Sequence, residues 1–323
     1  MARCDYQSKN RKFSKTRKEQ TTMEYKDRLV RATAANNQLR CFAVTTKDIV
    51  EHVRSVHNYS PIATAAIGRL MTGGVMMGNM LRNKDDTITI QIKSDGPLNY
   101  LVVTSKNDGS VRGCVHGDES IVLPPNESGH LNVGKAIGNG TLTVIEDLGL
   151  REPYTTEIAL HSSEIADDLT YFFAQSEQTP TSVGLGVLFD KDNVEVTRAG
   201  GYIVQLLPNT ETSVIDRLEE NIKKIKGVTD ILKVSDTPED LLKVVLDGFD
   251  INFTDNMPVF FHCDCSREKG RNILKLSGRK ELHDIIEENK PVEIVCNFCG
   301  KKYEYPIEEV KEILDSLNKK DEK

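Results

Sequence analysis

The stretch FHCDCSREKG, residues 261–270, places Cys263 and Cys265 on either side of a single aspartate. A second pair, Cys296 and Cys299, follows in the stretch VCNFCGKKY. Four of the seven cysteines in the chain therefore lie in its last quarter, as two closely spaced pairs. The pairs could form a structural clamp, a redox device, or both.

A metal site is the first interpretation of these four cysteines. The segment around them is too small to bury enough apolar surface to fold firmly alone. Four thiolates around Zn²⁺ form a tetrahedral site and supply much of the missing stability. The pattern therefore predicts one Zn²⁺ bound by Cys263, Cys265, Cys296 and Cys299. His262 adjoins the site, but four cysteines already complete the coordination, so we expect it to lie beside the metal rather than on it.

The single-residue gap in the first pair adds a redox option. Cys263 and Cys265 can share a metal, and they can also close a small, strained disulfide ring. Zinc holds its sulfurs as thiolates, which oxidants attack, and oxidation of either pair removes ligands and ejects the metal. A segment whose folding depends on the metal should then unfold. The spacing permits this switch without showing that it is used.

Charge and composition bound the class of protein. The 323 residues carry a net charge of −7, and residues 1–22 contribute +5 of it, so the rest carries −12. The basic segment has no apolar periodicity and is predicted to be a disordered extension. It has no apolar core of a secretory signal. The apolar stretch 62–81 contains Arg69, which would be costly in lipid, and is predicted to be a buried helix that follows the cap Ser60. We therefore expect a cytoplasmic protein with reduced thiols.

Periodicity divides the rest of the chain into three parts. Residues 23–208 alternate strand and helix patterns without long βαβ repeats, which predicts an α+β core rather than a doubly wound parallel sheet. Residues 259–323 form the small cysteine-containing part. The expected helices of the core are 46–57, 62–81 and 162–178, and its expected strands are 87–93, 99–105, 110–116, 141–149, 183–190 and 200–208.

The segment between these parts, residues 209–258, differs in composition from the core. Sixteen of the forty residues from Glu211 to Asp250 are charged, and the apolar residues keep a helical spacing. Thr237, followed by a proline and two acidic residues, predicts a helix start. Short helices with narrow apolar stripes depend on packing against a neighbour. The segment is thus predicted to be either a metastable helical linker or an ordinary helical connector.

Other chemistry is not indicated. The chain has no phosphate-binding loop, no dinucleotide fingerprint and no hydrolase or metalloprotease motif. We expect no catalytic residues. In the last part we expect a helix at 279–288, a strand leading into Cys296 and a C-terminal helix.

These motifs together resemble a known family. The pattern CDCSRE with a later CxxCG, the stretch LVRATAANNQLRCFAV at 29–44, SEQTPT at 176–181 and AGGYIVQLLP at 199–208 are similar to the redox-regulated bacterial holdases, the 33 kDa heat-shock chaperone family. The resemblance spans roughly residues 23–317. Residues 29–44 look like the opening strand of that family.

The resemblance implies a function. The family's fold would be an α+β core that binds clients and dimerises, a metastable linker and a zinc-binding redox-switch domain. Oxidation would form the disulfides Cys296–Cys299 and then Cys263–Cys265, release Zn²⁺, unfold the linker and expose apolar surface to partly unfolded clients without ATP. The reduced form would be a monomer and the oxidised form a homodimer. Thioredoxin- or glutaredoxin-type reductants and ATP-dependent foldases would complete the cycle.

Two other functions compete with this one. A zinc-ribbon adaptor for nucleic acid would use the Cys₄ site and the basic extension, but the acidic body and the lack of a basic–aromatic stripe count against it. A thiol oxidoreductase would use Cys296 and Cys299, but that pair does not open a helix in a βαβ setting. We expect no specific nucleic acid and no membrane as partner.

Overall fold

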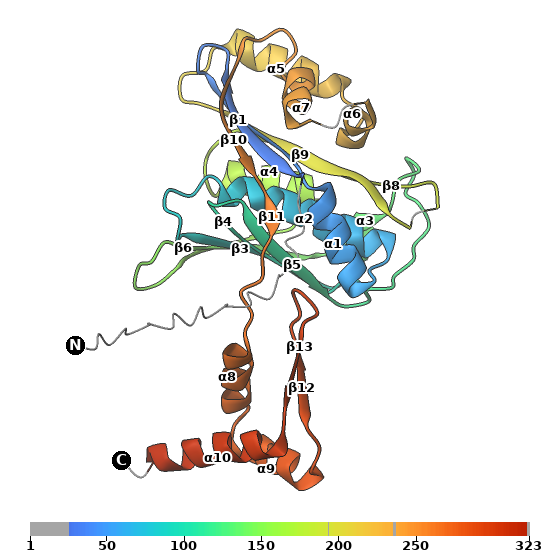
Figure 1. The fold of residues 1–323 in the computed structure, drawn as a ribbon. Coiled ribbons are helices and arrows are strands. Elements are labelled where there is room, and N and C mark those ends of the chain that lie inside the picture. The colour runs from blue at the N-terminus through green and yellow to red at the C-terminus, as the bar shows by residue number, and fades with distance from the viewer. Residues whose placement is uncertain (1–25, 193, 235–236, 322–323) are drawn as a thin grey trace, which may run out of the picture.

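The computed structural model describes residues 26–192, 194–234 and 237–321. The predicted extension at 1–22 lies outside these residues. The described chain is of the expected mixed α+β class, and Figure 1 shows two sheets enclosing a layer of helices. A further group of helices covers one sheet, and the C-terminal segment projects from the other.

The first sheet has five antiparallel strands in the order β10-β1-β2-β9-β8. Residues 29–44 were expected as one strand, and this was wrong: they form a hairpin whose turn places Ala35, Asn36 and Asn37 at positive φ. Asparagine tolerates that conformation better than most residues. The strands are β1 (Arg28–Ala34), β2 (Leu39–Thr45), β8 (Thr181–Phe189), β9 (Val196–Leu206) and β10 (Ile251–Pro258).

The second sheet has six strands in the order β11-β5-β4-β3-β6-β7. The strands predicted at 87–93, 99–105 and 110–116 are confirmed as β3, β4 and β5, which pair as antiparallel neighbours. Only the two-residue β11 runs parallel to its neighbour, β5. The strands are β3 (Thr87–Ser94), β4 (Tyr100–Lys106), β5 (Ser110–His116), β6 (Gly140–Asp147), β7 (Tyr154–Ala159) and β11 (Phe260–Phe261).

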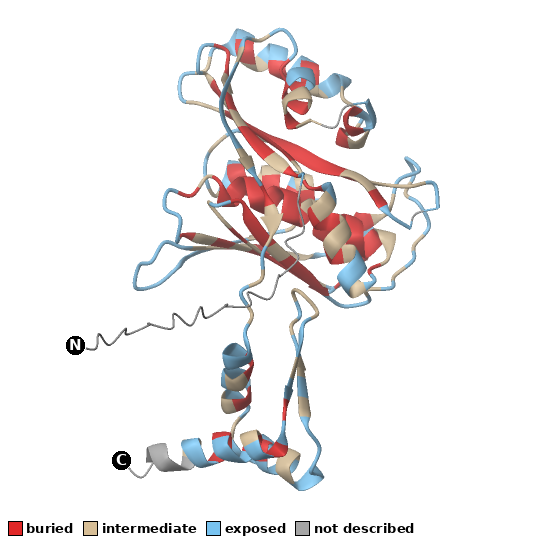
Figure 2. Ribbon diagram, viewed as in Figure 1, coloured by how far each residue is buried: buried red, intermediate tan, exposed pale blue. Residues whose placement is uncertain are grey.

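The helix α2 (Pro61–Gly78) lies at the centre of the layer between the sheets. The side chain of Ser60 caps it by accepting a hydrogen bond from the N–H of Ala63, as the sequence predicts. Figure 2 shows that almost the whole helix is buried, and Arg69 pairs with Glu164 at 2.6 Å. Among the described residues no helix is long and apolar enough to span a membrane. The other helices in the layer between the sheets are α1 (Lys47–His57), α3 (Val133–Ile137) and α4 (Ile165–Gln175).

Three helices cover the outer face of the five-stranded sheet: α5 (Thr212–Lys224), α6 (Val228–Val234) and α7 (Pro238–Val245). The hydroxyl of Thr237 accepts a hydrogen bond from the N–H of Asp240, which confirms the predicted cap. Leu241 and Leu242 are fully buried against the sheet, and this second apolar cluster is separate from the core between the sheets.

The chain leaves these helices as a strap along the edges of both sheets. Strand β10 pairs with β1 of the first sheet, and β11 then pairs with β5 of the second. Neither strand was expected: INFTDNMP has weak apolar alternation and none of its residues is buried, so the strand depends on its pairing with β1. Cys263 follows two residues after the strap ends. The helices α5 to α7, which fall in the segment predicted as a linker, and the cysteines are therefore joined by one continuous, sheet-bound segment.

The C-terminal segment has its own small apolar cluster. The expected helix α9 (Arg279–Glu288) and strand β12 (Val292–Val295) are present, and α8 (Arg267–Ser277), β13 (Lys302–Tyr305) and α10 (Ile307–Asp321) complete it. Six buried side chains make up this cluster: Leu274, Leu282, Tyr305, Val310, Ile313 and Leu314.

The carboxylate of Asp27 predicts a pH dependence of stability. It accepts the N–H of Ile49 in the first turn of α1, and burial raises its pKa to about 7, above the unfolded value of 3.8. A raised pKa favours the protonated acid in the folded state. The contribution of Asp27 to the free energy of unfolding should therefore be full below about pH 4 and fall as the pH rises to about 7. The loss should reach at most about 4 kcal/mol.

The variant Asp27→Asn tests this expectation, because its amide oxygen can still accept the same N–H without titrating. Thermal midpoints of both proteins between pH 5 and pH 8 should show a smaller decline for the variant. Parallel declines would mean that Asp27 does not cause the pH dependence.

Candidate metal centre

Four sulfurs meet where the C-terminal segment joins the core. The Sγ atoms of Cys263, Cys265, Cys296 and Cys299 all lie within 4.8 Å of one another. Cys263 lies 3.6 Å from Cys296, and Cys265 lies 3.4 Å from Cys299. A tetrahedral zinc site with Zn–S bonds of about 2.3 Å has sulfurs about 3.8 Å apart. The donor set and its spacing therefore fit a metal ion of this kind.

Local backbone structure holds the second pair in place. Cys296 and Cys299 occupy the turn between β12 and β13, where the N–H of Cys296 donates to Lys301 and the N–H of Gly300 donates to Cys296. Gly300 has φ of +67°, which favours glycine, and a Cβ there would come within 2.9 Å of Val56 on α1. The turn thus points its cysteines inward while its outer surface packs on the core.

Two of the four thiols, those of Cys263 and Cys299, resist ionisation. Burial raises the pKa of Cys263 to about 11, and burial also raises the pKa of Cys299. Burial opposes ionisation of Cys296 too, but backbone N–H groups of Cys299 and Phe298 lower its pKa overall. Three or four thiolates this close would repel one another, so a divalent cation is the natural partner of the cluster.

One core residue, Arg112 on β5, contacts both cysteine loops. Its guanidinium forms an ion pair with Asp264, the residue between Cys263 and Cys265. It also lies 4.8 Å from the ring centre of Phe298, the residue before Cys299. Lys269 in α8 binds the other oxygen of Asp264 at 2.6 Å. These contacts hold the pKa of Asp264 below its usual range, through Lys269 first and Arg112 next.

Helix α1 contributes a further contact to the second loop. The Nε2 of His57 lies 3.1 Å from the carbonyl oxygen of Phe298. His262 is placed differently: its N–H donates to Val111 beside the strap, and its ring lies against Phe260. Among the described residues, the group that could hold a metal ion consists of Cys263, Cys265, Cys296 and Cys299, and His262 is not a member of it.

Cys114 lies under this junction. It shares a strand face with Arg112 and is 1% exposed. Its pKa is raised to about 12, by burial and then by the nearby Cys296 and Cys263. A buried, protonated thiol reacts slowly with alkylating agents. Its reactivity therefore reports whether the cysteine loops sit on the core.

Replacing Arg112 with alanine should loosen this docking without removing a metal ligand. A partly exposed ion pair and a cation–π contact together contribute about 1–2 kcal/mol, so alkylation of Cys114 should accelerate about tenfold. Lys269→Ala is the matched control, since Lys269 binds Asp264 from within the C-terminal segment. Equal alkylation rates in both variants would exclude Arg112 as the docking residue.

The sequence identified the four cysteines but not the residues that dock them. Arg112, His57 and Val56 lie about 150 to 240 residues before the loops they contact, and their alternating strand and helix patterns are ordinary. The one local hint in the sequence is Asp264, an acidic residue between two cysteines, whose charge favours a basic partner such as Arg112.

Comparison with known proteins shows the family. The model of the Hsp33 protein family matches residues 27–306. The 33 kDa chaperonin of Lachnoclostridium phytofermentans is 45% identical over 293 residues, which cover 90% of this chain and 99% of the relative. That of Agathobacter rectalis is 46% identical over 287 residues, covering 89% and 99%. The crystal structure of the 33 kDa chaperonin from Thermotoga maritima superposes with a TM-score of 0.84 at 32% identity, covering 91% of this chain and 100% of that one. The chain therefore belongs to the Hsp33 family of chaperones.

Proposed function

We propose that this protein is a redox-regulated, ATP-independent holdase whose cysteine cluster controls its linker helices. The observation that carries the proposal is the continuous path from α7 through β10 and β11 to Cys263. When bound, Zn²⁺ would hold the four sulfurs as thiolates and keep both loops in one arrangement. Arg112 can grip both loops at once only while they share that arrangement.

Oxidation would convert the four thiolates into two disulfides, one after the other. Peroxide oxidises one thiolate of the Cys296–Cys299 pair to a sulfenic acid, and the second thiolate displaces hydroxide, which leaves as water after protonation, to form the disulfide. The pair Cys263–Cys265 would follow. The shortest sulfur distances run between the loops, but all edges of a tetrahedron are similar, so proximity does not select the pairing. Closure within one loop costs less chain entropy once the metal is gone.

Loss of the cluster would weaken the contacts that keep the strap in the sheets. The strap follows directly after these helices, and a bidentate ion pair at 2.5 and 2.6 Å joins Glu239 on α7 to Arg28 on β1, the strand that pairs with the strap. Helices of 13, 7 and 8 residues are marginal by themselves. Their departure would uncover the apolar outer face of the five-stranded sheet for unfolding clients.

The remaining features of the proposal follow from this opening. The protein would act by binding rather than by turnover, in the reducing cytoplasm. Oxidised protomers would form homodimers through newly exposed surface. Thioredoxin- or glutaredoxin-type reductants would restore the thiols, and ATP-dependent foldases would receive the clients.

Treatment of the zinc-loaded protein with peroxide at mild heat tests the proposal. We expect release of one Zn²⁺ per chain, loss of helical far-UV signal, suppression of client aggregation, and the disulfides Cys296–Cys299 and Cys263–Cys265 in peptide mapping. Zinc release with unchanged helix content and unchanged aggregation would contradict it.

A further inference from the structure

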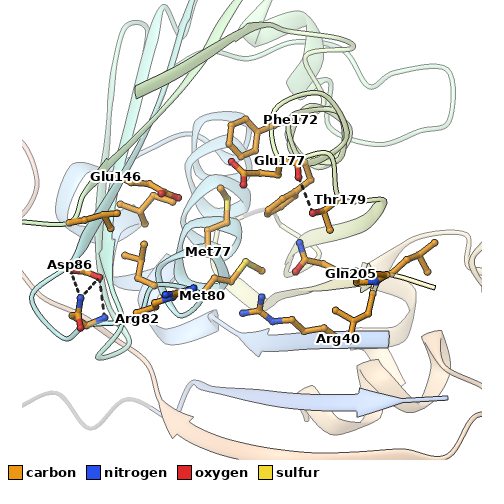
Figure 3. Close-up of a pocket in the computed structure, with 18 residues that line it drawn as sticks. Arg40, Met77, Met80, Arg82, Asp86, Glu146, Phe172, Glu177, Thr179 and Gln205 are labelled. Atoms are coloured by element: carbon orange, nitrogen blue, oxygen red, sulfur yellow. Dashed lines mark hydrogen bonds between the residues drawn. The ribbon is translucent and has the colours of Figure 1, made fainter. Parts of the chain in front are cut away.

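A cleft of about 530 Å³ opens between the two sheets, and none of the four clustered cysteines lines it. Its apolar lining includes Met77 and Met80 from the end of α2 and Phe172 and Phe173 from α4. Figure 3 shows the two methionines between Arg40 on one wall and Glu146 on the other. Methionine side chains adapt to differently shaped apolar groups, so this lining suits a variable occupant.

One wall of the cleft carries unpartnered negative charge. Glu146 on β6 is half-buried, and none of the described residues forms an ion pair or hydrogen bond with its carboxylate. Its pKa is raised by burial and then by the neighbouring carboxylates of Glu177 and Asp86. Asp86 is satisfied by hydrogen bonds from Asn83, but Glu146 is not. A cation placed here would relieve both the burial and the repulsion.

The opposite wall carries unpartnered positive charge. Arg40 lies 4.8 Å from the ring centre of Phe42, and its pKa is lowered by burial and by Arg31. No carboxylate in the described part of the chain pairs with it. Gln205, only 5% exposed, lines the same wall and uses its amide nitrogen for a long contact to Thr181, which leaves its side-chain oxygen free of described donors.

We propose that this cleft binds an extended segment of a client chain in which a bulky apolar residue is flanked by Lys or Arg on one side and a carboxylate on the other. The apolar residue would contact Met77 and Met80, the basic residue Glu146, and the carboxylate Arg40. This inference rests on the proposed function in that it takes the occupant to be an unfolding client.

A chain segment fits better than a small zwitterion because apolar side chains continue beyond the cleft. Leu148 lines it, and Leu150 and Tyr154 on the same β6–β7 hairpin are 70% and 61% exposed. The cleft is also open while α5 to α7 cover the first sheet, so it would offer a weak contact before the linker opens. Its wall at Leu206–Pro208 leads directly into α5.

A charge exchange tests the proposal on the reduced, zinc-loaded protein. Labelled peptides with the core Lys-Leu-Phe-Glu or Glu-Leu-Phe-Glu would be titrated and followed by fluorescence anisotropy. The first should bind about tenfold more tightly, and Glu146→Lys should reverse the preference. Glu152→Lys, on the same hairpin but outside the cleft, should leave it unchanged.

Three outcomes of the charge exchange would each overturn the proposal: no preference in the unaltered protein, no reversal in Glu146→Lys, or the same reversal in Glu152→Lys. Displacement of the peptide by free leucine or phenylalanine at similar concentration would instead assign the cleft to a small zwitterion and refute a chain segment. Suppression of client aggregation by the oxidised variants is measured in parallel. If the oxidised protein suppresses aggregation but the peptide test fails, the assignment of the cleft alone is refuted. If the oxidised, unaltered protein does not suppress aggregation, the proposed function is refuted.

Discussion

Replacing Cys296 with serine is expected to lower zinc affinity by more than about a hundredfold. Loss of a residue that only hydrogen-bonds to a metal ligand already costs up to about a hundredfold, and Cys296 is itself a predicted ligand. The C-terminal cluster of six buried side chains is too small to compensate for the lost metal. The cysteine loops should then leave Arg112, and the protein should be partly active as a holdase without oxidant. Zinc content, amide hydrogen exchange in residues 264–317 and suppression of client aggregation would measure these effects.

Cys114→Ser provides the control for this prediction. It removes a buried thiol at the same junction that belongs to no metal-binding group of the described residues. This variant should keep its zinc and stay inactive until oxidised. A Cys296→Ser protein that lacks zinc yet remains as inactive as the unaltered protein would show that the metal does not restrain the linker.

The variant Leu242→Ala should act as a holdase without oxidant even though it still binds zinc. Leu242 is fully buried between α7 and the five-stranded sheet, and truncation of a buried leucine costs about 2–5 kcal/mol. A helix of eight residues has little stability with which to absorb such a loss. The reduced variant should therefore suppress client aggregation without oxidant while it retains one Zn²⁺ per chain.

Val244→Ala is the matched control, because this neighbour on the same helix is 43% exposed. It should leave the reduced protein inactive. Reduced Leu242→Ala protein that is inactive despite a loosened linker, measured by hydrogen exchange in α7, would contradict the assignment of the covered sheet face as a client-binding surface.

Local signals in the sequence predicted much of this fold. The cap at Ser60, the cap at Thr237 and the strand predicted at 87–93 each depend on residues close in the chain, and each is confirmed. The four cysteines were singled out because their paired spacing is typical of metal ligands. Their spacing predicted their convergence on one point.

Long-range partners could not be predicted in the same way. Strand β10 owes its conformation to β1, more than 200 residues earlier, and its own sequence has little strand character. Arg112 and Asp264 are 152 residues apart, and either would be an ordinary surface charge without the other. Contacts of this kind, between residues far apart in the chain, join the cysteine loops to the core.

The central claim is that oxidation at the cysteine cluster releases the linker helices from the five-stranded sheet. Cys41 on β2 tests it most directly, since its thiol lies in the apolar cluster beneath those helices and burial raises its pKa to about 12. In a Cys4→Ser, Cys114→Ser protein, alkylation of Cys41 would be followed by mass spectrometry before and after oxidation. The account predicts slow alkylation in the reduced, zinc-bound state and a rate at least about a hundredfold higher once both disulfides have formed. Continued protection of Cys41 in the fully oxidised, zinc-free protein would contradict it.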